Sequence, residues 1–103
     1  MSPLPYQFHP EAEAEFLAAI DWYAERDADV ATDFAVLVRD AVQLIAELPQ
    51  AWPTWRNRED LRVRVLRRFP FSIIYAVEAD LLVIIAVAHH RRRPGYWLHR
   101  APR

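Results

Sequence analysis

Residues Leu61–Trp97 read LRVRVLRRFPFSIIYAVEADLLVIIAVAHHRRRPGYW, and this stretch decides the fold. Its residues 61–66 alternate apolar and charged side chains, which is the period of a half-buried β-strand. Residues 71–78 are rich in the aromatic and β-branched side chains that favour strands. Residues 81–88 are apolar at both odd and even positions, as in a central strand that is covered on both faces. The stretch therefore predicts three successive strands.

The links between these three strands are too short for parallel connections. Only residues 67–70 and 79–80 separate the strands, and links of that length join antiparallel neighbours. The result is a meander in which the first and third strands run parallel to each other and finish at the same end of the sheet. We expect Arg62 and Arg64 on the sheet face away from the helices, and residues 89–97 at the surface.

The first half of the chain predicts two helices that follow a short edge strand at residues 6–8. A Pro-Glu pair at residues 10–11 favours a helix start, and apolar side chains at helical spacing carry this helix to about residue 26. Asp27 is suited to cap a second helix, which should end before Pro49. Two consecutive helices with so short a break form a hairpin.

Residues 50–60 are predicted to form a loop, and this loop contains Trp52 and Trp55. The two indoles either pack over the core between helices and sheet or stack on a nucleobase. The whole chain, residues 1–103, is expected to be a single domain. Its fold class is α+β, with the order β-α-α-β-β-β and the helical hairpin packed on a small, mainly antiparallel sheet.

The composition excludes several classes of protein. A hydrophobic content of 53% with four Trp argues against disorder. The absence of Cys excludes disulfides and thiolate chemistry, and fits a reducing compartment. The N-terminus has no signal-peptide pattern, and the longest apolar run is too short to span a bilayer. We therefore expect a cytoplasmic protein without a membrane partner.

The charges are unevenly distributed, although the formal net charge is only −1. Residues 1–60 carry twelve acidic side chains and four Arg, a balance of −8, whereas residues 61–103 carry two acidic side chains and nine Arg, a balance of +7. Every basic residue is Arg, which binds phosphate or carboxylate through two parallel hydrogen bonds. The C-terminal half is expected to meet an anionic partner.

Four side chains are candidates for one functional surface: Arg68, His89, Arg92 and Tyr96. Arg68 lies in the link between the first and second strands of the meander, and His89 ends the third strand. Both are therefore expected at the same end of the predicted sheet. In a ribonuclease that uses the 2′-hydroxyl of RNA, the arginines would hold the phosphate while His89 or Tyr96 transferred protons, without metal or cofactor. On a docking surface the same arginines would act as anchors.

The remaining basic residues are candidates for nucleic-acid contacts: Arg62, Arg64, Arg67, Arg91 and Arg93. The alternative is a solvated basic tail, with Tyr96 and Trp97 packed as a lid. A metal site is not expected, because adjacent histidines on a strand point to opposite faces and no Cys completes a zinc set.

Two segments resemble a known family. RRFPFSIIYAVEADLLVIIAVAHHRRRPGYW, residues 67–97, resembles the C-terminal half of the RelE/ParE superfamily of type II toxin–antitoxin toxins, often called plasmid-stabilisation proteins. HPEAEAEFLAAIDWY, residues 9–23, resembles the first helix of that superfamily. The resemblance implies a compact, growth-inhibiting toxin that a small cognate antitoxin neutralises in a hetero-oligomer.

The superfamily divides into two activities. RelE-like members cleave mRNA on the ribosome, whereas ParE-like members poison DNA gyrase and lack a recognised nuclease site. The positions near functional side chains of the nuclease members are Arg68, His89 or His90, Arg92 and Tyr96, with Glu59 as an acidic partner. The absence of Lys departs from RelE itself and favours the ParE-like or an uncharacterised branch. A metal-independent, RelE-like endoribonuclease and a non-catalytic nucleic-acid-binding module remain alternatives, so whether the protein is an enzyme stays open.

Overall fold

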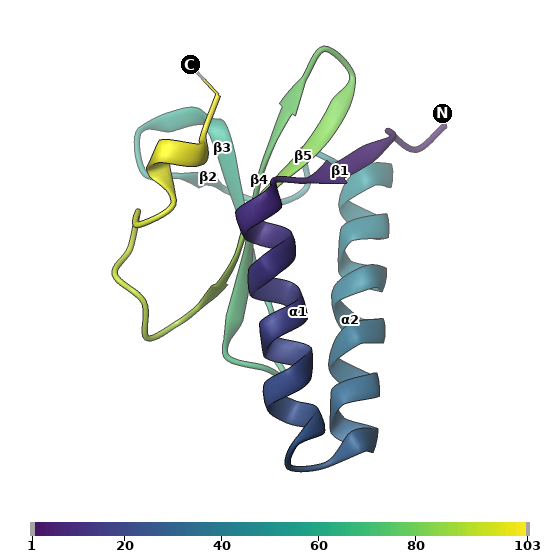
Figure 1. The fold of residues 1–103 in the computed structure, drawn as a ribbon. Helices are drawn as coiled ribbons and strands as arrows, with labels where there is room; N and C mark the ends of the chain where they lie inside the picture. The colour runs from purple at the N-terminus through teal and green to yellow at the C-terminus, as the bar shows by residue number, and fades with distance from the viewer. Residues whose placement is uncertain (1, 103) are drawn as a thin grey trace.

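Two antiparallel helices lie side by side across one face of a five-stranded sheet (Figure 1). This computed structural model describes residues 2–102. The elements are β1 (Tyr6–Phe8), α1 (Pro10–Ala24), α2 (Ala28–Glu47), β2 (Thr54–Trp55), β3 (Arg58–Val65), β4 (Phe71–Glu78), β5 (Leu81–His89) and a short 3₁₀ helix, η1 (Leu98–Arg100). No helix among the described residues is long and apolar enough to cross a membrane.

The sheet has the strand order β1-β5-β4-β3-β2. The three strands β3, β4 and β5 form the predicted antiparallel meander, and β1 adds to the far edge of β5 in parallel. The predicted α+β class and the helical hairpin on a mainly antiparallel sheet are confirmed. The central position of β5 is confirmed as well, because its residues are buried on both faces of the sheet.

The helix boundaries follow from capping. The Nδ1 atom of His9 accepts the backbone N–H of Glu11 at 3.1 Å, and Pro10 occupies the first helical position of α1. The Asp27 carboxylate accepts two backbone N–H groups at the start of α2, as its position predicted. The second helix ends at Glu47, and Leu48 before Pro49 takes a non-helical conformation.

The expectation of a loop over residues 50–60 is wrong. Residues 54–55 form β2, and β3 begins at Arg58, which pairs with Trp55 across a tight turn. Arg56 takes a positive φ of 50° in this turn, a conformation that its sequence does not signal. A two-residue strand is too short to show an alternating pattern, so periodicity missed it.

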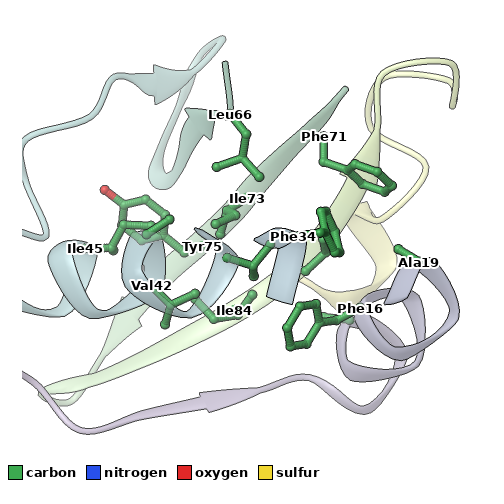
Figure 2. Packing of buried hydrophobic residues seen from close by; sticks show 14 of the residues in the cluster. Phe16, Ala19, Phe34, Val42, Ile45, Leu66, Phe71, Ile73, Tyr75 and Ile84 are labelled. Atoms are coloured by element: carbon green, nitrogen blue, oxygen red, sulfur yellow. The ribbon is translucent and has the colours of Figure 1, made fainter. Parts of the chain in front are cut away.

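The core between α2 and the sheet gathers phenylalanine rings at one end, and Val42, Ile45 and Tyr75 at the other (Figure 2). The Phe34 ring lies 5.0 Å from the Phe71 ring and 5.1 Å from the Phe69 ring. Val42 and Ile45 of α2 are fully buried towards the opposite end of the sheet. Trp52 packs at the margin of this cluster, which confirms the core-packing interpretation for that indole.

A second apolar cluster lies on the other face of the sheet, and the C-terminal segment covers it. Trp97 is only 2% exposed and packs against Leu61, Ile74 and Ile85. The Trp55 ring meets the Trp97 ring edge-on at 4.9 Å. The expectation that residues 89–97 end on the surface is therefore wrong for Trp97, which forms the lid that was weighed as the alternative.

The placement of Arg62 and Arg64 on the outer face is also wrong. Arg62 Nη1 donates to the carbonyl of Trp52 at 2.6 Å, and Arg64 Nη1 donates to the carbonyl of Ala41 on α2 at 2.9 Å. Both arginines lie on the helix side because the apolar side of β3 turns to the Trp97 cluster instead. Alternation reveals that a strand has one apolar side, but not which layer covers that side.

Candidate functional site

A groove lies between the second half of α1 and the chain that leaves β5, with a volume of about 920 Å³. Its floor is apolar, formed by Ala18, Ala19 and Val87, and the exposed ring of Trp22 stands on one wall. The opposite rim is basic: His89, His90, Arg91 and Arg92. The groove combines an apolar floor with two arginine side chains along its edge.

His89 lies on the helix side of this groove. It pairs with Phe71 in the strand register, and the two rings meet edge-on at 5.0 Å. The Nδ1 atom of His89 accepts the backbone N–H of Arg91 at 3.0 Å. Partial burial, followed by the positive charges of Arg91 and His90, lowers the pKa of His89 below its ordinary value of 6.5. At pH 7 the ring is therefore neutral, with Nδ1 occupied and the proton on Nε2.

His90 turns the other way. Its Nε2 atom lies 2.9 Å from the Ser72 hydroxyl, and Ser72 faces the sheet side opposite to its neighbours Phe71 and Ile73. His89, and not His90, is thus the histidine nearer the helices. The pair does not converge on a common point, as the alternation of strand side chains requires.

Tyr96 closes one end of the groove and is bound to α1. Its hydroxyl donates to Glu15 Oε2 at 2.5 Å. The guanidinium of Arg92 lies 3.9 Å from the centroid of the Tyr96 ring, within cation–π distance. Burial and the bond to the Glu15 carboxylate raise the pKa of Tyr96 well above its ordinary value. Tyr96 therefore stays protonated, and its hydroxyl is already engaged.

The predicted surface divides into two places. His89, Arg92 and Tyr96 line the groove beside α1. Arg68 lines a separate groove between α2 and β3, where it forms an ion pair of 2.8 Å with Asp33. The link after β3 leans over α2 because Phe69 packs against Phe34. This packing directs Arg68 towards α2, whereas the chain leaving β5 turns towards α1.

The other predicted residues are also distributed. Arg62 and Arg64 bind backbone carbonyl groups, as described above. Arg67 lines the second groove with Arg68, whereas Arg91 and Arg93 are exposed beside the first. Glu59 lines a third, smaller hollow together with Asp60 and Tyr75, away from the His89 groove. Within residues 2–102, no three His, Asp or Glu side chains converge in a way that could hold a metal ion.

Two residues that hold the site together were not predicted. Arg100 forms two hydrogen bonds with the Glu15 carboxylate, at 2.9 and 3.2 Å, and only 6% of its side chain is exposed. Glu15 was not singled out among the twelve acidic side chains of residues 1–60. Its spacing from Ala12 and Ala19 places it on the buried stripe of α1, and that position was a signal that the sequence offered.

The fold and this site define a class, that of small α+β toxins of the RelE/ParE type. The ParE toxin family of the type II toxin–antitoxin system parDE matches residues 6–94, so the chain belongs to that family. A comparison with curated proteins finds no significant match. The family match confirms the resemblance to the RelE/ParE superfamily and identifies the ParE toxin family within it.

One similar solved structure is described as "Chromosomal ParDE TA system from P. aeruginosa". Its TM-score against this chain is 0.72 at 18% sequence identity, and the match covers 84% of this chain and 95% of that one. At this identity the likeness establishes the fold. The protein is a ParE toxin of a type II toxin–antitoxin system, and membership in a parDE system implies a cognate ParD antitoxin as its partner.

Proposed function

We propose that this toxin inhibits growth by poisoning DNA gyrase in the cytoplasm, and that its cognate antitoxin neutralises it by occupying the groove beside α1. The observation that carries the proposal is the chemistry of that groove, which has an apolar floor, arginines on its rim, and hydrogen bonds that already engage His89 Nδ1 and the Tyr96 hydroxyl. Such a surface is suited to docking a protein and poorly suited to catalysis.

The geometry speaks against an endoribonuclease at this site. Cleavage by the 2′-hydroxyl of RNA needs a base that can take a proton near neutral pH. His89 has its Nδ1 lone pair engaged and carries its proton on Nε2, and the Tyr96 hydroxyl is bound to Glu15. Arg68, which would hold a phosphate beside His89, lies in the other groove. These contacts support the docking role over the nuclease role.

The groove favours an acidic, amphipathic segment of the antitoxin. Apolar side chains of such a segment would cover the floor at Ala18 and Val87 and the exposed ring of Trp22. Its carboxylates would meet Arg91 and Arg92, whose bidentate geometry suits carboxylate oxygens. A segment that is disordered alone and folds on binding would bury this apolar surface in a toxin–antitoxin hetero-oligomer.

A short pulse of toxin expression tests the activity. Purified gyrase should lose supercoiling activity and accumulate cleaved DNA in the presence of the toxin, while mapping of RNA 5′ ends in the pulsed cells detects no new cleavage in translated mRNA. The double variant Arg91→Ala/Arg92→Ala should lose most of this effect. The variant Arg56→Ala, at an exposed arginine that does not line the groove, should keep it.

New mRNA ends that appear at once, with gyrase unaffected, would instead establish a RelE-like nuclease. Nucleic-acid binding with a steep dependence on salt, without inhibition of growth, would establish the binding module. Rescue of growth by the antitoxin, and loss of that rescue in the double variant, separates the docking proposal from a general effect of overexpression.

A further inference from the structure

The edge of β5 is closed by side chains where its neighbouring strand ends. The strand β1 pairs only with residues 82–84 of β5. Beyond that point, the backbone N–H of Val87 donates to Glu15 Oε1 at 3.1 Å, and the carbonyl of Ile85 accepts from Arg100 Nη1 at 3.3 Å. These are edge groups that a further strand would otherwise pair. Glu15 and Arg100 therefore replace a strand over this part of the edge.

The carboxylate of Glu15 is the centre of this arrangement. It accepts the Val87 N–H, the Tyr96 hydroxyl and both terminal nitrogens of Arg100. Glu15 is 16% exposed and Arg100 is 6% exposed, so the pair is largely removed from water. Arg100 has a second acidic partner, because its Nε lies 3.2 Å from Oε2 of the half-exposed Glu11. Glu15 is the more buried of the two carboxylates, so loss of its charge would remove the closest compensation of a buried cation, which is strongly unfavourable.

Three of these four bonds reach the segment that follows β5, residues 91–102, which we name the C-terminal strap. The strap begins with the exposed arginines at positions 91–93, and Tyr96 and Arg100 are its two anchors on Glu15. Between the anchors, Trp97 is buried on the second face of the sheet. Glu15 thus ties the helix, the β5 edge and the strap together, and Glu11, one turn earlier on α1, adds contacts to His99 and Arg100 of the strap.

We infer that Glu15 is a positioning residue of the docking groove, because its carboxylate holds the C-terminal strap and so fixes the basic rim opposite α1. The inference rests on the proposed docking function where it concerns the partner, and on the contacts of Glu15 alone where it concerns the strap. Glu15 keeps its own polar atoms occupied within the fold, and acts on a partner through the arginines that the strap presents. A rim that is already ordered costs less entropy to bind than a loose one.

The decisive variant is Glu15→Gln, with Glu13→Gln as its matched control on the exposed side of the same helix. The amide keeps the shape of the carboxylate and one acceptor oxygen, but loses its charge and cannot accept from all four donors. In the free toxin, hydrogen exchange at the Val87 amide should accelerate about tenfold or more in Glu15→Gln, since bonds to a charged acceptor are lost. Trypsin should cut after Arg91 and Arg92 faster in this variant, relative to its cutting after Arg26.

The second readout is binding to the ParD antitoxin. Glu15→Gln should bind it about tenfold more weakly, because the rim must be ordered on binding, whereas Glu13→Gln should bind as the wild type does. Tyr96→Phe, which removes one anchor and leaves the ion pair, should fall between them. This milder variant keeps the test decisive if Glu15→Gln does not fold.

Unchanged exchange at Val87 and unchanged cleavage in the strap would overturn the inference. So would a loosened strap that binds the antitoxin with wild-type affinity, because the carboxylate would then have a structural role only. A wild-type toxin that fails to bind any antitoxin contradicts the proposed function instead, and the exchange and cleavage measurements still decide whether Glu15 holds the strap.

Discussion

His89 is bound on one nitrogen by the residue that lies two positions later in the chain. Partial burial, followed by the positive charges of Arg91 and His90, lowers the pKa of His89 and so disfavours its protonated form. A histidine that is uncharged at neutral pH cannot hold a phosphate by charge. Under the proposed docking function, His89 is a neutral part of the groove wall, and its catalytic role stays an untested prediction of the sequence.

The titration of His89 gives a direct prediction. Its pKa in the folded protein should lie below 6.5, and Arg91→Ala should raise it by removing one of the two positive charges. Because the unfolded chain binds this proton more readily, the contribution of His89 to stability is fully present above pH 6.5. It is lost as the pH falls towards the pKa of the folded state. NMR titration of the His89 ring protons in both proteins measures the shift, and an unchanged pKa in Arg91→Ala would contradict this account.

The strands and the strap explain why this sheet has two apolar faces. The bulge at Ile85, which lies between the pairs Tyr75–Ile84 and Ile74–Ala86, turns both Ile85 and Ala86 to the second face. Within residues 2–102, neither α1 nor α2 covers that face, and Trp97 and Trp55 pack over it. The strap therefore acts as a third layer, although it contains little regular structure.

Removal of Trp97 should unfold much of this layer. Trp97→Ala should lower the free energy of unfolding by about 3–5 kcal/mol, since a large and fully buried aromatic side chain leaves a cavity. Trp22→Ala removes an indole that is 52% exposed and should cost less than about 1 kcal/mol. Urea denaturation followed by circular dichroism compares the two variants. Equal losses of stability would mean that the strap does not contribute to the core.

The sequence predicted the elements that carry their own pattern. Residues 71–78 were bounded as they are in β4, because aromatic and β-branched side chains mark a buried strand. The sequence could not predict which side of β3 faces the helices, since its alternating pattern fits either orientation. Among the site residues, His89, Arg92 and Tyr96 were grouped because they are close in sequence. The Glu15–Arg100 pair, 85 residues apart, appears only once the helix and the strap are placed in space.

At the scale of the whole molecule, the charge division follows the layers only in part. The acidic half supplies both helices, and the basic half supplies β3, β4, β5 and the strap. Several arginines of the basic half already have partners within the fold. Arg62 and Arg64 bind carbonyl groups, Arg68 pairs with Asp33, and Arg100 pairs with Glu15. The exposed arginines at positions 91–93 remain as a basic rim beside the groove. Apart from Arg67 in the second groove, the exposed positive charge of the basic half is therefore concentrated beside the first groove, within the residues that the structure describes.

This concentration predicts how the antitoxin associates. If Arg91 and Arg92 steer an acidic segment into the groove, the association rate constant should fall by about tenfold or more from low salt to high salt. The dissociation rate constant should change much less, because salt screens interactions between charges and not the apolar contacts with the floor of the groove. Arg91→Ala/Arg92→Ala should slow association at low salt and flatten its dependence on ionic strength. Arg56→Ala, which removes an exposed charge that does not line the groove, should leave the salt dependence as it is in the wild type. Stopped-flow mixing of toxin and antitoxin at several salt concentrations measures both rate constants. Association that is independent of salt in the wild type, or equally affected by the two sets of substitutions, would show that the basic rim does not steer the partner.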